Sequence, residues 1–159
     1  MVLQLRIDER LTHGQVCTTW INTLKATHVI VANDQVANDD FQKSIMGMGI
    51  PSSVKSIFTT LEKAVGILND PRSEFLKIFL VAKTPKDALY LVEHVEGIEQ
   101  VNLANYGVLV KSDKKIVYSL NVFVFLDEDD VNYVKQIQNK VKSVYFQDIV
   151  GKSKKMIEF

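Results

Sequence analysis

Short apolar runs alternate with longer amphipathic stretches along the chain, and this alternation limits the fold more than any other feature. Each run has the length of a buried strand, whereas apolar residues in the stretches between them recur at helical spacing. The sequence predicts strands at Val2–Ile7, His28–Ala32, Val54–Phe58, Lys77–Val81 and Val144–Phe146, and a shorter one that starts at Val101. This order predicts an α/β domain whose open, twisted, mostly parallel sheet has about seven strands and helices on both faces.

Capping residues and apolar spacing predict where the helices begin and end. Thr84, followed by a proline and then an acid, has the pattern of an N-cap. Thr59 and Glu62 have the spacing of a capping box, which predicts a helix that runs to about Leu68. The other helices are marked by Val16, Trp20, Ile21 and Leu24, by Phe41, Ile45 and Met48, and by Asp127–Asp130 followed by Val131, Val134, Ile137 and Val141. In the C-terminal part, Lys111–Lys115 separates two β-rich runs and predicts an antiparallel hairpin.

The charge balance and the single cysteine argue against several classes of protein. Lys and Arg number 19, as do Asp and Glu, so the formal net charge is zero and the basic excess of a nucleic-acid-binding protein is absent. Cys17 has no second thiol or nearby histidine at ligand spacing, which argues against a disulfide or a metal site and favours a reducing cytoplasm. No apolar run approaches the ~20 residues that span a bilayer, so we expect membrane contact only through a partner. Without a linker or repeat, we expect one domain over residues 1–159.

The segment after the first predicted strand, Asp8–Gln15, carries most of the chemistry. Ligands of parallel sheets bind beyond the carboxyl ends of the strands, and the N-terminus of a helix favours an anion. Arg10 can bind phosphoryl oxygens through two hydrogen bonds, and His13 can act as a nucleophile or a proton carrier. Asp8 can orient either of them, and Gly14 allows a close backbone approach. The same residues would also suit an ordinary capping loop with a partly exposed histidine.

Loops after the other predicted strands supply further candidates at the same edge of the sheet. Five of their residues could line a site: Asn33, Asp34, Lys83, Thr84 and Asn102. We interpret His28, His94 and Cys17 as structural or surface residues. The acids of Asp127–Asp130 are interpreted as partners of the helix dipole rather than as a metal site.

The longer segment Arg6–Val16 resembles a specific family signature. It follows the pattern Arg-Ile/Val-Asp-X-Arg-Leu-Ile/Leu-His-Gly-Gln-Val of the IIB components of the mannose, fructose and sorbose family of bacterial phosphotransferase systems (PTS). It departs from that pattern only at Thr12, where the family has an aliphatic residue. Val31–Asp34 also resembles the second-strand loop of the family, and the resemblance covers essentially the whole chain.

The resemblance implies a phosphotransferase that carries a phosphoryl group from a protein phosphohistidine to a sugar. His13 would accept the group on Nδ1 from a IIA partner and pass it to a sugar entering through the IIC and IID membrane components. Arg10 would supply positive charge, Asp8 would orient Arg10 or the imidazole, and the backbone at Gly14 and Gln15 would bind the phosphoryl oxygens. No metal, nucleotide or other cofactor is needed, because the phosphohistidine carries the energy. The sugar would belong to the mannose, fructose, sorbose or N-acetylgalactosamine class.

Two segments depart from the family pattern. Ala104 stands where the family has a glycine, and Val150–Ser153 replaces a Val-Pro-Ser/Thr-Asp/Glu element. These departures leave open an alternative, in which the chain is a non-catalytic regulatory module of the same fold that binds IIA or another protein. The sequence also leaves open which sugar is carried and whether the chain forms a homo-oligomer.

Overall fold

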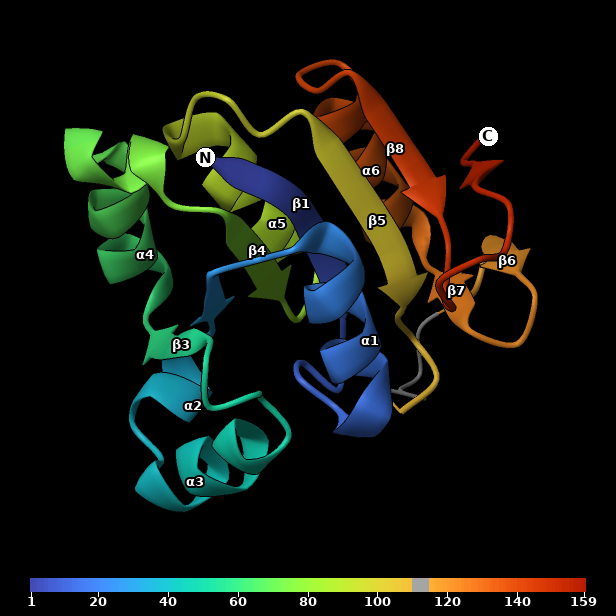
Figure 1. Ribbon diagram of the computed structural model, residues 1–159. Helices are drawn as coiled ribbons and strands as arrows, with labels where there is room; N and C mark the ends of the chain where they lie inside the picture. Colours follow the sequence, from blue (N-terminus) through green and yellow to red (C-terminus); the bar gives the residue numbers. More distant parts are fainter. Residues whose placement is uncertain (110–114) are drawn as a thin grey trace.

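A sheet of seven strands organises residues 1–109 and 115–159, which the computed structural model describes (Figure 1). The strand order is β3-β2-β4-β1-β5-β8-β9, and neighbouring strands pair in parallel except for β8 and β9. The strands are β1 (Val2–Asp8), β2 (His28–Ala32), β3 (Lys55–Thr59), β4 (Ile78–Ala82), β5 (Gln100–Asn105), β8 (Ser143–Phe146) and β9 (Lys155–Met156). The predicted α/β class and the mostly parallel sheet are confirmed.

A separate antiparallel pair consists of β6 (Tyr118–Leu120) and β7 (Val124–Leu126). Val124 also forms a bridge with Tyr106, so this pair begins where β5 ends. An antiparallel element is therefore present, but the predicted place of its connection is wrong: residues 121–123 join the two strands, and both strands come after Lys115. Residues 110–114 lie outside the described part of the chain, and they include most of the segment Lys111–Lys115 that we expected between the strands.

Helices cover both faces of the sheet, as predicted (Figure 1). On one face, α4 (Leu61–Asn69), α5 (Pro85–His94) and α6 (Glu128–Gln138) pack around strand residues that include Leu5 and Ile7. On the other face, α1 (Gly14–Leu24), α2 (Asp34–Ala37) and α3 (Asp40–Met48) lie near Phe79 and Val81. Because successive strand residues point to opposite faces, the polar residues Arg6 and Asp8 of β1 point toward α1. No helix among the described residues is long and apolar enough to cross a bilayer.

The start of α4 differs from the prediction by one residue. Thr60 is the N-cap, and its Oγ1 accepts a hydrogen bond from the backbone N–H of Lys63 at 3.2 Å. Thr59 remains in β3, where it pairs with Ala32 and its carbonyl oxygen accepts a hydrogen bond from Asn33. The predicted capping box at Thr59 is wrong because sheet pairing extends the strand by one residue.

Two short helices were not predicted. One is α2, whose N-cap Asn33 accepts a hydrogen bond from the backbone N–H of Val36 at 2.9 Å. The other is a 3-10 helix, η1 (Pro71–Phe75), which is capped by Asp70. Both follow a polar residue with an extended backbone, so the side-chain cap replaces the hydrogen bonds that an isolated short turn would lack.

Candidate functional site

β1 ends in a tight turn that leads to α1. The backbone N–H of Leu11 donates to the carbonyl oxygen of Asp8 at 2.9 Å, which places Glu9 and Arg10 at the centre of the turn. Leu11 has a φ of 60°, a left-handed conformation that costs a non-glycine residue about 1–3 kcal/mol. Its side chain is buried in the cluster that includes Cys17 of α1, and this burial offsets the backbone strain.

Asp8 binds two arginines at the end of β1. Its Oδ2 accepts hydrogen bonds from Nη2 of Arg6 at 3.1 Å and from Nη2 of Arg10 at 3.0 Å. Its Oδ1 accepts hydrogen bonds from Nε and from the backbone N–H of Arg10, each at 3.0 Å. Arg10 is therefore held along one edge of its guanidinium group in bidentate geometry. Because two guanidinium groups share one carboxylate, the cluster keeps one net positive charge beside the loop that carries His13.

The two arginines occupy different environments. Hydrogen bonds to Asp8 are the main cause that raises the pKa of Arg10, whose side chain is 30% exposed. Burial lowers the pKa of Arg6, and the charge of Asp8 opposes that effect. The Arg6 guanidinium also lies 5.6 Å from the centre of the Trp20 ring, within the range of a cation–π contact. Arg6 thus binds Asp8 on the buried side of the cluster, where it also contacts Trp20, whereas Arg10 binds Asp8 on the side that is partly exposed to solvent.

His13 is the N-cap of α1, and its side chain is exposed. Its side chain makes no capping hydrogen bond, so among the described residues the first backbone N–H groups of α1 have no side-chain acceptor. Gly14 follows with a φ of +53°, in the left-handed region that glycine adopts without strain. An uncapped helix N-terminus beside an exposed imidazole and a positive cluster suits a phosphoryl group.

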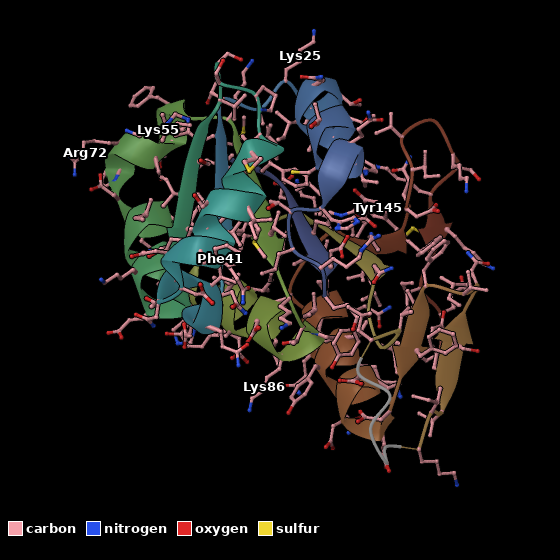
Figure 2. The ribbon with its side chains drawn as sticks, turned by 90° about the horizontal axis from the view of Figure 1, so that it is seen from below. Lys25, Phe41, Lys55, Arg72, Lys86 and Tyr145 are labelled. Atoms are coloured by element: carbon pink, nitrogen blue, oxygen red, sulfur yellow. The ribbon has the colours of Figure 1, made fainter. Side chains whose placement is uncertain are left out.

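A hollow of about 270 Å³ opens beside His13 and extends to α3. Its lining includes Gly14 on the side of α1 and Ile45 on the side of α3. The Oγ1 of Thr18 donates to the carbonyl oxygen of Gly49 at 2.7 Å and joins the two helices. Figure 2 looks onto α3, where Phe41 is labelled. None of the residues of α3 is buried. Its side chains Phe41, Ile45 and Met48 are exposed, whereas Met46 is half-buried and packs on the cluster that includes Cys17.

The structure brings four of the predicted lining residues together in a different hollow. Asn33, Asp34, Lys83 and Thr84 border a space of about 310 Å³ beyond the ends of β2 and β4, and His13 does not line it. In three of the four residues, the side chain accepts a hydrogen bond from a backbone N–H group. Asn33 caps α2, Asp34 accepts a hydrogen bond from the backbone N–H of Leu61 at 2.9 Å, and Thr84 caps α5.

Asn102, the fifth predicted lining residue, borders neither hollow. It is fully buried in β5, where its Nδ2 donates to the carbonyl oxygen of Gln147 at 2.8 Å. Its Oδ1 accepts a hydrogen bond from the backbone N–H of the same residue at 3.0 Å. Asn102 therefore joins β5 to the chain that follows β8.

Comparisons with known proteins find similarity along almost the whole chain. The family described as "PTS system sorbose subfamily IIB component" matches residues 2–158. The N-acetylgalactosamine-specific phosphotransferase enzyme IIB component 1 of Escherichia coli strain K12 is 34% identical over 157 residues, which cover 98% of this chain and 96% of the relative. The chain belongs to the sorbose subfamily of PTS IIB components. Membership implies a transferase role in sugar phosphotransfer.

Solved structures of relatives have the fold of this IIB component. The crystal structure of the N-acetylgalactosamine-specific IIB component 1 from Escherichia coli has a TM-score of 0.85 and covers 99% of this chain and 100% of its own. The crystal structure of the IIB domain of the sorbose permease from Klebsiella pneumoniae has a TM-score of 0.87 at 26% identity, and the match covers 97% of this chain and 91% of the sorbose domain.

A relative with a further component in the same chain was also found. The mannose-specific EIIAB component of Escherichia coli strain K12 is 32% identical over 138 residues, which are 86% of this chain and 41% of the relative.

Two residues of the IIB site were not singled out from the sequence. Arg6 was quoted only as part of the signature, and its contact with Trp20 depends on how α1 packs on β1. Glu9 occupies the variable position of the signature, and its partners are backbone N–H groups of residues 107–109. No local pattern marks a side chain that binds backbone so distant in sequence. Among the described residues, no group of three or more His, Cys, Asp or Glu could hold a metal ion.

A substitution at Thr84 tests whether its hydroxyl caps α5 or takes part in phosphoryl transfer. Its Oγ1 accepts a hydrogen bond from the backbone N–H of Asp87 at 3.0 Å. We expect Thr84→Ala to lower the free energy of unfolding by about 1 kcal/mol in a denaturant titration, because an N-cap is lost. Thr84→Ser keeps the hydroxyl and should stay near the wild type. A slower phosphoryl transfer in Thr84→Ala at unchanged stability would contradict the capping role.

Cys17 should be unreactive in the folded IIB component. Burial raises the pKa of its thiol to about 11, so at pH 8 only on the order of 0.1% is thiolate, the reactive form. We expect iodoacetamide to modify Cys17 at least about a hundredfold more slowly in the native protein than in urea. Mass spectrometry of samples quenched over time measures both rates. Similar rates in the two states would contradict the burial of this thiol.

Proposed function

We propose that this IIB component is a phosphocarrier that accepts a phosphoryl group on His13 from the phosphohistidine of a IIA protein. It then transfers the group to a sugar during uptake through IIC and IID membrane components. The observation that carries the proposal is the exposed imidazole of His13 at the uncapped N-terminus of α1, on the same loop as the Asp8–Arg10 pair. The fused EIIAB relative supports IIA as the donor, since its printed name joins both components in one protein.

The transfer needs a nucleophile and a site for the charge on the phosphoryl oxygens. In the proposed first step, Nδ1 of neutral His13 attacks phosphorus, and the electron pair of the broken P–N bond returns to the donor imidazole. The backbone N–H groups at Gly14 and Gln15 and the guanidinium of Arg10 stabilise the oxygens in the transition state. Asp8 acts by holding Arg10, because five hydrogen bonds fix its carboxylate between two arginines.

The second step delivers the phosphoryl group to a sugar hydroxyl. The relatives are named for N-acetylgalactosamine, sorbose, fructose and mannose, and we propose a sugar of this class. In this role residues 1–159 act as one IIB domain on the cytoplasmic side of the membrane. In this proposal the domain meets the membrane through IIC and IID.

The regulatory alternative rested on Ala104 and Val150–Ser153. Ala104 is 1% exposed within β5, where the pairing register with β1 shifts by one residue between Ile7 and Asp8. The extra methyl group is thus accommodated inside the sheet and does not enter the hollow beside His13. Nothing about Ala104 therefore favours a loss of phosphoryl transfer.

A phosphorylation assay tests the proposal. The protein is incubated with phosphoenolpyruvate, the general phosphotransferase proteins and the cognate IIA, and we expect an acid-labile, alkali-stable label. Mass spectrometry should locate the phosphoryl group on the peptide with His13 and not on those with His28 or His94. Uptake of sugar by membranes with the intact IIC and IID set separates a carrier from a regulatory module. Labelling without any transfer to sugar would favour the regulatory module.

A further inference from the structure

We infer that Glu9 is a positioning residue for phosphoryl transfer, and that its buried carboxylate holds the loop of His13 against the end of β5. This inference rests on the proposed function of the loop. Glu9 is 4% exposed. Its Oε1 accepts a hydrogen bond from the backbone N–H of Gly107 at 3.2 Å. Its Oε2 accepts hydrogen bonds from the backbone N–H groups of Val108 at 2.8 Å and Leu109 at 3.0 Å. We call these three hydrogen bonds the Glu9 clamp.

The backbone that binds Glu9 has the geometry of an anion-binding nest, in which successive N–H groups point at one negative charge. Gly107 has a φ of +85°, and a Cβ at this position would collide with the carbonyl oxygen of Phe125. The position therefore requires glycine. Tyr106 is fixed on both sides, because its N–H donates to Phe123 and its carbonyl oxygen accepts from Phe125, each at 2.8 Å. The contacts that shape the nest at Tyr106 and Gly107 therefore do not depend on Glu9.

The topology explains why a carboxylate at this place matters. β1 and β5 are neighbours, but the chain leaves β1 toward β2 on one side of the sheet order and leaves β5 toward β8 on the other. Loops that diverge in this way open a crevice where anionic ligands of α/β proteins commonly bind. In this IIB component the side chain of Glu9 fills the nest at that crevice. An incoming phosphoryl group therefore finds free N–H donors at the start of α1 and not at residues 107–109.

The clamp also restrains a strained loop. Leu11 has a left-handed φ, and a non-glycine residue keeps such a conformation only where neighbouring contacts fix the chain. The carboxylate of Asp8 holds the backbone N–H of Arg10 in the turn, and the backbone N–H of Glu9 donates to the carbonyl oxygen of Asn105 at 2.9 Å. With its side chain held as well, Glu9 determines the direction in which the chain continues to His13. Glu9 reaches no phosphoryl group itself, and its effect passes through the position of Arg10 and His13.

Kinetics of two substitutions test this role. We expect Glu9→Gln to lower kcat for phosphorylation by phospho-IIA about tenfold, because an amide donor then faces the N–H of Gly107. We expect Glu9→Ala to lower the same kcat about a hundredfold, since misplacement of a reacting group by about 1 Å has effects of that size. KM for phospho-IIA should stay unchanged, because a residue that is 4% exposed offers little surface to a partner. Glu99→Ala is the matched control, since Glu99 forms an exposed ion pair with Lys142.

Two further measurements separate positioning from a general loss of structure. Added acetate should restore part of kcat in Glu9→Ala, where a free carboxylate can enter the nest, but not in Glu9→Gln, where the side chain still fills it. Amide hydrogen exchange of Gly107 should become faster in both variants, and that of Val108 and Leu109 in Glu9→Ala. Wild-type kcat in both Glu9 variants, or a rise in KM alone, would overturn the inference while leaving the proposed function intact. A wild-type protein that takes up no label would overturn the proposed function, and faster exchange in the variants would then show a clamp that serves the fold alone.

Discussion

His13→Ala should abolish phosphorylation of the protein by phospho-IIA, with a loss of at least about a thousandfold. Removal of a covalent nucleophile leaves only binding and electrostatic effects, which cannot form the P–N bond. The imidazole of His13 is exposed and caps no helix through its side chain, so the folded structure does not depend on it. We therefore expect the free energy of unfolding to change by less than about 0.5 kcal/mol.

Two other histidines provide controls for this experiment. His94 lies at the end of α5, where its Nδ1 is 2.7 Å from the carbonyl oxygen of Tyr90. His28 begins β2 and lies 2.9 Å from the hydroxyl of Thr27. We expect His28→Ala and His94→Ala to be labelled at the wild-type rate. Label that persists in His13→Ala, or that disappears in either control at unchanged stability, would contradict the assignment of His13.

The alternation of strands and helices was predictable because burial on both faces makes strands such as β2 and β4 almost continuously apolar. His28–Ala32 has the same limits in the prediction and in the structure. The ends of helices and strands were harder to predict from the sequence where pairing with another strand determines them. Thr59 and Thr60 are both acceptable caps in isolation, and pairing of Thr59 with Ala32 decides between them. The exposed apolar side of α3 was also unpredictable, since spacing shows one apolar face but not which way it points.

The candidate site was predictable only where the signature marks it. Asp8 and Arg10 were singled out together, and the structure places them in a bidentate pair. The roles of His13, Gly14 and Gln15 stay predictions until phosphorylation is measured. Lys83 and Thr84 were chosen as lining residues because they follow a strand, and the hydroxyl of Thr84 caps α5, as its predicted N-cap pattern indicated. Sequence position at a strand end therefore indicates a site less well than a set of residue types in fixed order.

Arg10→Lys should slow transfer of the phosphoryl group to sugar about a hundredfold and phosphorylation of His13 by a smaller factor. Lysine offers a point charge on a flexible stem, so it cannot bind Asp8 along one edge while a fixed planar group faces the phosphoryl oxygens. The first half-reaction exchanges one imidazole for another. The second requires attack by a sugar hydroxyl, a much weaker nucleophile, and so depends more on charge stabilisation at phosphorus.

The chain contains a matched control for this substitution. Arg72 binds Asp70 with the same local pattern, through Nε, Nη2 and the backbone N–H, but at the exposed start of η1. Arg72→Lys should therefore leave both half-reactions unchanged, although it removes a similar pair of hydrogen bonds. Single-turnover assays that follow labelled phosphate from IIA to the IIB component, and from there to sugar, measure the two steps separately. Equal losses in both steps would contradict a special demand for Arg10 in transfer to sugar, because a merely misplaced loop would slow both alike.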